Sequence, residues 1–390
     1  MGMVSGDNRR VSPSTASAPT AADLVDWDAA VRLARLAVPA GPRVPTATRR
    51  ATVALLHRSI VGATPWAGRI TGLPDAARHA AATAEILVVD RTGLMTASAA
   101  WLRGLMRNMG DRGIAAPDVG RGTRALATAH VGAVLGYMST RLLGQVLPPL
   151  GASAGTRPGA RLLLVAPNVL AIRQRLDLDV LDLPAWITLH EATHLIQLSA
   201  APWLAEHLVA QLGAVVRGLV DASRRTASGR AERCARLARA AARARSADGR
   251  PSEPAALLLG GLLEPSERAA LARVAALLTL LEGHAEAVLD AVDPSRMPSV
   301  HRLRAVLART RRNAGDAGGV GPGSGSGSLL HHMIGMEAKE AQYADGAAFV
   351  RTVVARVGHA GLNAVWAAPD HLPRPGELAR PDQWIERLGL

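Results

Sequence analysis

Residues 182–202 read DLPAWITLHEATHLIQLSAAP, and this is the most informative stretch of the chain. The residues around its centre are mostly apolar, which predicts a largely buried α-helix. We expect Asp182 to be the N-cap and Pro184 to lie in the first turn. The helix should then run to about Ser199, before Pro202 stops it.

Inside this helix stands the pattern His190-Glu191-Ala192-Thr193-His194. Positions i and i+4 share one helix face, so both imidazoles can reach a single ion, and Zn²⁺ suits neutral imidazole nitrogen. Glu191 points about a third of a turn away and can address a water at the metal, as a general base would. The alternative is a salt-bridged helix surface with coincidental histidines. The apolar surroundings disfavour it, because buried polar groups need partners.

A second long helix is predicted from Ser266 to Asp293, and it contains the sequence LLEGHAE at residues 280–286. A catalytic zinc usually has three protein ligands, so the two histidines leave one ligand to be found. Glu282 is the candidate, because it lies in a helix otherwise rich in alanine and leucine. The alternative is a solvated polar face.

Two further residues of this helix have candidate roles. Glu286, one turn beyond Glu282, could accept the free N–H of His190 or His194 and fix its tautomer. His284 has three alternatives, namely contact with the substrate, replacement of Glu282 as the ligand, or a surface position.

A third cluster lies at residues 336–349 and reads MEAKEAQYADGAAF. It holds the only lysine, Lys339, the only phenylalanine, Phe349, and one of the two tyrosines, Tyr343. Lys339 and Tyr343 are one helical turn apart and could present an ammonium and a phenol to a developing oxyanion. Alternatively, the two aromatic residues belong to the core and Lys339 pairs with a neighbouring glutamate.

The composition bounds the class of protein. The 390 residues are 48% hydrophobic but only 3% aromatic, and they suffice for a sizeable core. No apolar run is long enough to span a membrane, and the first residues lack the apolar run of a secretory signal. Cys234 is the only cysteine and cannot form an intrachain disulfide, so we expect a cytoplasmic protein.

The net charge of +13 raises the question of nucleic-acid binding. Several arginines cluster between Arg224 and Arg245, but no aromatic residue lies among them to stack on bases. A solvated basic helix is the favoured interpretation, and we expect no nucleic-acid partner.

The remaining chain predicts a single, mainly α-helical domain. Residues 1–22 have the composition of a disordered tail, and residues 23–390 should form the folded domain. A glycine- and serine-rich flexible loop is expected at 313–328. The runs Ile86–Val89 and Leu162–Val165 are β-like, so we expect at most a small β element.

Several stretches together resemble the actinobacterial zincin-like zinc metalloprotease family, which was formerly a domain of unknown function and has one branch associated with deazaflavin cofactor biosynthesis. The likeness covers nearly all of residues 24–390, and the stretches that carry it are VDWDAAVRLA (25–34), ILVVDRTGL (86–94), GYMSTRLLGQ (136–145), LLLVAPNV (162–169), LHEATHLIQLSAAPWLAEHL (189–208), LLEGHAEAVLDAV (280–292), MPSVHRLR (297–304), GMEAKEAQYADGAAFV (335–350) and VGHAGLNAVWAAPDHLP (357–373).

The resemblance implies a mostly helical zincin-like fold with one zinc ion. It implies His190 and His194 as ligands and Glu191 as the catalytic base. The acidic pair on the later helix is similar to that of the glutamate-ligand zincins, which would make Glu282 the third ligand and Glu286 the orienting acid.

The leading hypothesis from the sequence is therefore a zinc-dependent metallohydrolase that acts on a peptide or protein substrate. Glu191 would take the proton of a zinc-activated water, and Tyr343 or His284 would stabilise the oxyanion. The alternative is a non-catalytic zincin scaffold in which a structural metal supports binding to a partner. The presence of Glu191 beside the ligands favours the enzyme, since a structural site needs no base.

Overall fold

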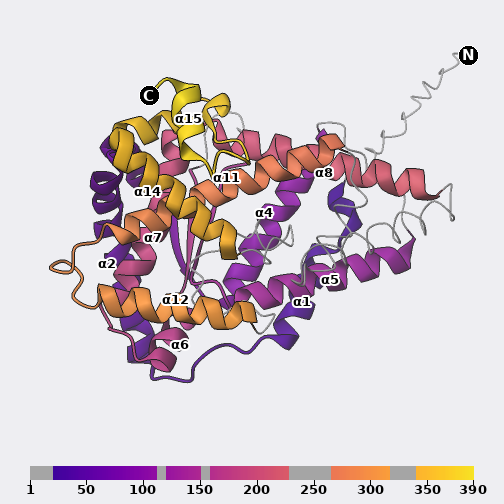
Figure 1. Cartoon of the computed structure of the whole chain (residues 1–390). Coiled ribbons are helices and arrows are strands. Elements are labelled where there is room, and N and C mark those ends of the chain that lie inside the picture. Colours follow the sequence, from indigo (N-terminus) through magenta and orange to yellow (C-terminus); the bar gives the residue numbers. More distant parts are fainter. Residues whose placement is uncertain (1–20, 112–119, 151–158, 228–264, 317–339) are drawn as a thin grey trace, which may run out of the picture.

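The computed structural model describes residues 21–111, 120–150, 159–227, 265–316 and 340–390, and the fold is that of these residues. Helices surround one small sheet (Figure 1). The prediction of a mainly α-helical fold with a small β element is confirmed.

The described helices have the following bounds. Residues 21–139 contain the helices η1 (Ala21–Leu24), α1 (Trp27–Ala37), α2 (Thr46–Thr71), α3 (Pro74–Thr83), α4 (Arg91–Asp111) and α5 (Arg121–Ser139). The later part contains α6 (Ala166–Leu176), α7 (Asp182–Ala200), α8 (Leu204–Ala227), α11 (Pro265–Asp290), α12 (Val300–Asp316), α14 (Glu340–Asn363), η3 (Ala364–Trp366), η4 (Pro369–His371) and α15 (Pro381–Leu388).

The sheet has the strand order β1-β3-β2, formed by Glu85–Val89, Arg161–Val165 and Gly144–Leu147. β1 runs parallel to β3, and β2 runs antiparallel to it. The two strands predicted from apolar runs are confirmed as β1 and β3. Sequence reasoning missed β2, because GQVL is only four residues long and begins with residues of low strand propensity.

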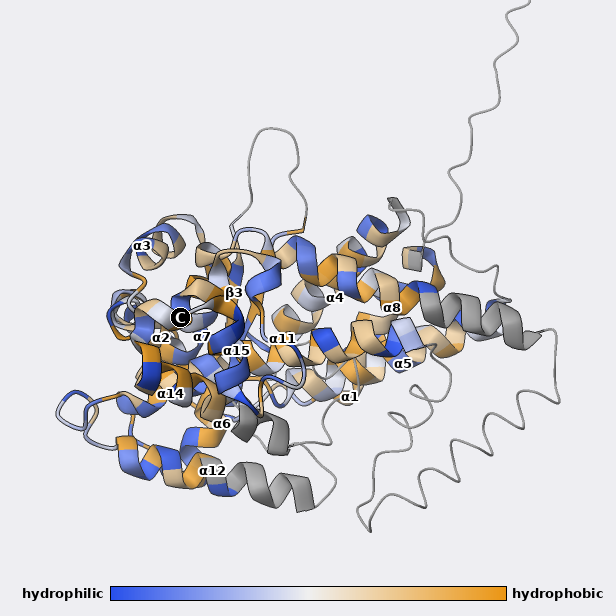
Figure 2. Cartoon of the chain, turned by 45° about the horizontal axis from the view of Figure 1, so that its top comes forward, coloured by the Kyte–Doolittle hydropathy of each residue, from blue (hydrophilic) through white to orange (hydrophobic). Residues whose placement is uncertain are grey.

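The central strand β3 separates two apolar cores. Leu162 and Leu164 pack into one cluster, while Leu163 and Val165 pack into the other, and all four side chains are fully buried. This alternation is the two-residue period of a strand, here with apolar side chains on both faces. In Figure 2 the helices are mostly hydrophobic where they face this interior and hydrophilic outside.

Helix α7 belongs to one of these cores and packs closely against α2 and α3. Its beginning differs from the prediction, because the N-cap position is Leu181 and not Asp182. The side chain of Asp179 accepts hydrogen bonds from the backbone amides of Leu181 and Asp182. Asp182 instead accepts two hydrogen bonds from Ser299, which ties the start of α7 to the segment before α12.

Helix α11 spans both cores, since Val274 and Leu280 pack into one and Val288 and Leu289 into the other. It lies alongside α14 (Figure 1). The two helices cross at a glycine contact: a Cβ atom on Gly283 would overlap with the backbone of Gly346. The contact brings two helix backbones together beside Glu282.

Some sequence predictions fall partly or wholly outside the described residues. Of the predicted tail 1–22, residues 21 and 22 belong to η1, and residues 1–20 lie outside. Of the predicted loop 313–328, residues 313–316 end α12, and residues 317–328 lie outside. The side chains of the arginine cluster at 224–245 also lie outside. Within the described part of the chain, no helix is both long and apolar enough to cross a membrane.

Candidate metal centre

Three side chains from α7 and α11 converge on one point. The Nε2 atoms of His190 and His194 lie 3.2 Å apart. Glu282 places one carboxylate oxygen 3.4 Å from the Nε2 atom of His190 and the other 3.6 Å from that of His194. These are the only three residues that form a potential metal-binding group in the described part of the chain.

The distances fit a zinc ion. Bonds of about 2.0–2.1 Å in a tetrahedral site place ligand atoms roughly 3.3–3.4 Å apart. The 3.2 Å between the two Nε2 atoms and the 3.4 Å from His190 to one oxygen of Glu282 are close to this value, and the other oxygen of Glu282 lies 3.6 Å from His194. Imidazole nitrogen and carboxylate oxygen are also the donor types of catalytic zinc sites. The residues present therefore suit zinc in both geometry and chemistry.

The imidazole of His194 is neutral in this environment. Burial lowers the pKa of His194 below its usual value, although the nearby Glu282 charge partly opposes the shift. A metal ligand must be deprotonated, so burial prepares His194 for binding.

The Nδ1 atom of His194 lies 2.9 Å from the side-chain oxygen of Gln197, one turn further along α7. The Nδ1 atom of His194 therefore faces Gln197, and the predicted contact of Glu286 with this histidine stays a prediction. Glu286 is half-buried, and its charge opposes a small part of the lowering of the pKa of His194 that burial causes. Its predicted contact with His190 stays a prediction.

The structure disagrees with two of the three alternatives for His284, the surface position and the replacement of Glu282. Its exposure is 1%, which excludes a surface position. Its Nδ1 atom lies 3.2 Å from the side-chain nitrogen of Gln197, and its ring packs against Trp366. The ligand group contains Glu282 and not His284. The predicted contact of His284 with a substrate or an oxyanion stays a prediction.

The candidate base Glu191 is 1% exposed and lies beside the ligand group. Its carboxylate packs against Gly144 in β2, where a Cβ atom would come within 2.5 Å of both Cδ and Oε1 of Glu191. The first residue of an edge strand therefore provides the space for this carboxylate.

The cluster at residues 336–349 divides into described and undescribed parts. Phe349 is fully buried and packs edge-to-face on Trp384, with ring centroids 5.6 Å apart, so it is a core aromatic residue. Tyr343 lies in α14 one turn before Gly346. The side chain of Tyr343 and the whole of Lys339 lie outside the described part, so their predicted roles stay predictions.

A pocket opens beside the metal centre. His194, Gln197 and Glu282 form its polar end. Its walls are largely apolar, and they come from α4, β2, α8 and α11. Sequence reasoning missed this pocket, Gly144 and Gln197. Of these, only Gln197 carried a local signal, since it follows His194 by three residues and shares its helix face.

The fold and the candidate metal centre define a helical zincin-like protein, in which an HExxH helix and a later helix bring two histidines and a glutamate together. A family model described as "Zincin-like metallopeptidase" matches residues 25–385. The chain belongs to this zincin-like metallopeptidase family.

One comparison with solved structures supports the fold. The chain is similar to a crystal structure from Chloroflexus aurantiacus, that of "a putative hydrolase with a novel fold". The identity is 25%, the TM-score is 0.58, and the match covers 94% of this chain and 99% of the other. Among curated proteins, no sequence matches this chain.

Proposed function

We propose that the protein is a zinc-dependent hydrolase, and more narrowly a peptidase that acts on a peptide or protein substrate. The observation that carries this proposal is the convergence of His190, His194 and Glu282 beside the buried Glu191. A catalytic zinc keeps one position open for water or substrate, whereas a structural zinc usually has four protein ligands. Three ligands among the described residues, with a pocket that reaches two of them, favour the enzyme over the scaffold. A cytoplasmic setting, which the single Cys234 favours, is part of the proposal.

In this proposal His190, His194 and Glu282 hold the ion. When bound, zinc supplies Lewis-acid chemistry that polarises a carbonyl group and eases deprotonation of water near neutral pH. Glu191 handles the proton: its carboxylate accepts it from the attacking water and later donates it to the leaving nitrogen of the peptide bond. Packing against Gly144 restricts the orientations of this carboxylate, which keeps it positioned for both proton transfers.

The oxyanion that develops on the carbonyl needs a donor, and we assign this role to Tyr343. A phenol can donate one hydrogen bond to such an oxygen. The backbone of α14 supports the assignment, because Tyr343 lies one turn before Gly346, which packs on Gly283 beside Glu282. Tyr343→Phe should then lower the turnover rate and leave zinc content unchanged.

Two substitutions test the proposed function. Glu191→Gln should retain zinc and lose hydrolysis, because the amide cannot accept the proton, whereas His190→Ala should lose both. Zinc content is measured by atomic emission, and hydrolysis is measured by mass spectrometry on a proteome-derived peptide mixture. Glu206→Gln, at an exposed glutamate of α8, is the control. A Glu191→Gln protein as active as the wild type would contradict the proposal, as would a wild type that does not bind zinc.

A further inference from the structure

The side chain of Gln197 joins the two helices that provide the metal ligands. It is 1% exposed on α7. Its Oε1 atom lies 2.9 Å from Nδ1 of His194, and its Nε2 atom donates to the carbonyl oxygen of Leu281 at 2.9 Å. Leu281 immediately precedes Glu282, so one buried amide contacts one ligand of the centre directly and the backbone beside another.

The orientation of this amide follows from its partners. The carbonyl oxygen of Leu281 can only accept a hydrogen bond, so the NH₂ group of Gln197 must face α11. The Oε1 atom then faces His194, and the Nδ1 atom of His194 must carry the proton that it donates. This leaves the lone pair of His194 on Nε2, the atom that lies near Glu282.

A neighbouring histidine supports the same orientation. The Nε2 atom of Gln197 also lies 3.2 Å from Nδ1 of His284. In the neutral tautomer that carries its proton on Nε2, the Nδ1 atom of His284 can accept this second N–H. The two N–H groups and the oxygen of the Gln197 amide therefore all have partners.

We propose that Gln197 is a positioning residue for the metal. It selects Nε2 of His194 as the ligand atom and sets the distance between α7 and α11 at the level of Glu282. Partners of ligating histidines typically contribute 10- to 100-fold to metal affinity. Gln197 should therefore act on zinc affinity even where no hydrolysis is measured.

The test compares zinc affinity in three variants by competition with a chromogenic chelator, starting from metal-free full-length protein. Gln197→Leu should bind zinc roughly 10- to 100-fold more weakly than the wild type. Gln197→Glu keeps an acceptor for His194 and should retain more affinity than Gln197→Leu. Thr188→Val is the matched control, because it removes another buried side-chain hydrogen bond of α7 that does not involve a ligand. We expect it to bind zinc like the wild type.

Zinc affinity of Gln197→Leu within twofold of the wild type would overturn the proposal. If Gln197→Leu does not fold, the protonated nitrogen of His194 in the wild type tests the proposal instead. Long-range ¹H–¹⁵N spectra of the zinc-loaded protein should show His194 protonated at Nδ1. A proton on Nε2 of His194 would overturn the proposal as well.

A second, independent observation concerns the pocket. Its walls include the side chains of Trp101, Val146, Leu147, Leu204, Leu208 and Leu278. Apart from the metal-proximal end, the polar lining residue is Gln145, whose amide donates to the backbone of Val146. A charged group placed among these walls would lose its hydration without gaining a partner, whereas an apolar group would be stabilised.

We infer that the substrate carries a bulky apolar side chain next to the scissile carbonyl, an inference that rests on the proposed function. The pocket reaches His194 and Glu282, so a group that fills it lies next to the atom bound at the metal. Hydrophobic pockets discriminate by roughly 10- to 200-fold for a change as small as one methylene. Leucine-like or larger groups should therefore be preferred over charged ones.

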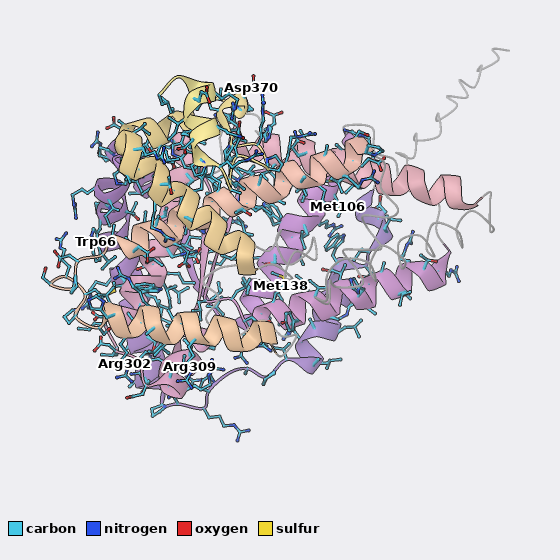
Figure 3. The ribbon with its side chains drawn as sticks, viewed as in Figure 1. Trp66, Met106, Met138, Arg302, Arg309 and Asp370 are labelled. Atoms are coloured by element: carbon cyan, nitrogen blue, oxygen red, sulfur yellow. The ribbon has the colours of Figure 1, made fainter. Side chains whose placement is uncertain are left out.

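The test uses binding, which does not require turnover. Zinc-loaded Glu191→Gln protein is titrated by calorimetry with peptide hydroxamates that differ only in one side group: isobutyl, carboxymethyl or aminobutyl. The isobutyl compound should bind at least about 10-fold more tightly than the charged ones. Trp101→Ala should weaken this preference. Trp66→Ala is the control, because Trp66 lies at the edge of the molecule, well away from Met106 on the helix of Trp101 (Figure 3).

Equal or tighter binding of the charged hydroxamates would overturn the pocket assignment. The two proposals can fail separately. If the isobutyl compound binds most tightly but no peptide is hydrolysed, the proposed function fails while the pocket assignment holds.

Discussion

Gly144 lies so close to Glu191 that a Cβ atom on the glycine would come within 2.5 Å of the carboxylate carbon. The two residues are 47 positions apart in sequence, on β2 and α7. The carboxylate that we assign as the base is therefore held by a residue that has no polar atom in its side chain.

This contact predicts that Gly144→Ala displaces the carboxylate of Glu191. Loss of a positioned general base typically costs about 10²- to 10⁴-fold in rate, and we expect a loss near the lower end, because the carboxylate is still present. Zinc content should remain at the wild-type level. Gly62→Ala, at a helical glycine with open space around it, should leave both unchanged. Full activity of Gly144→Ala would contradict the packing argument.

The glycine crossing of α11 and α14 gives a second prediction. A methyl group on Gly283 would overlap with Gly346, and the helices would have to separate beside Glu282. Overpacking of this kind costs about 1–3 kcal/mol, so Gly283→Ala should lower both the free energy of unfolding and the zinc affinity. Denaturant unfolding and chelator competition measure the two effects. Gly122→Ala, with no neighbouring atoms near its added methyl group, should show neither loss.

The third ligand can be tested through metal-linked stability. Zinc binds the folded state, so it should raise the unfolding temperature of the wild type; the gain is about 2.7 kcal/mol when free zinc is 100 times its dissociation constant. Glu282→Ala should abolish this increase, and Glu286→Ala should reduce it less, because we expect Glu286 to orient a ligand rather than bind the ion. The exposed Glu206→Ala should behave like the wild type. An unchanged zinc response in Glu282→Ala would remove this residue from the ligand set.

The buried histidines predict how the stability of the metal-free protein depends on pH. Burial lowers the pKa of His284 to about 3 and that of His194 below its usual value. Below a pH of about 6.5 the unfolded chain binds protons at these histidines more readily than the folded chain does, so their contribution to stability falls as the pH decreases, and for His284 it falls until a pH of about 3. Each histidine contributes a slope of up to about 1.4 kcal/mol per pH unit.

Replacing His284 removes one of these slopes. His284→Gln should make the stability of the metal-free protein less dependent on pH between about 6.5 and 3, measured by denaturant unfolding in the presence of a chelator. The groups that face this ring are Gln197, Trp366, His359 and His194. His57→Gln, at an exposed histidine of α2, should not change the pH dependence. If the free energy of unfolding of His284→Gln and that of the wild type change with pH in parallel, burial of His284 does not control this pH dependence.

Part of the metal centre could be predicted from the sequence because it is local. His190 and His194 are one turn apart in a single helix, so helical geometry alone brings their rings together. Glu282 could be predicted as well, although less directly, since a glutamate between leucines in an apolar helix requires a buried partner. The histidine pair of α7 and the glutamate of α11 can therefore both be predicted from local sequence.

Other features left no such signal. The sequence predicts Asp182 as the N-cap of α7. In the structure, Asp179 instead accepts the hydrogen bonds from the backbone amides of Leu181 and Asp182, in the turn before the helix. His284 is a ligand candidate by residue type, yet it contacts Gln197 and Trp366 and does not belong to the ligand group. Neighbours from distant segments surround His284, and the sequence around it does not predict them.

Local signals in the chain predict the helical class, the two β-like runs and the pair of imidazoles on α7, because propensity and the periods of helix and strand act over a few residues. Long-range contacts instead place Gly144 of β2 on Glu191, join His194 to Leu281 through Gln197, and end an apolar pocket at the candidate ligands. The first two of these contacts join residues 47 and 84 positions apart, and their free energy comes from packing and hydrogen bonding that form when the chain folds.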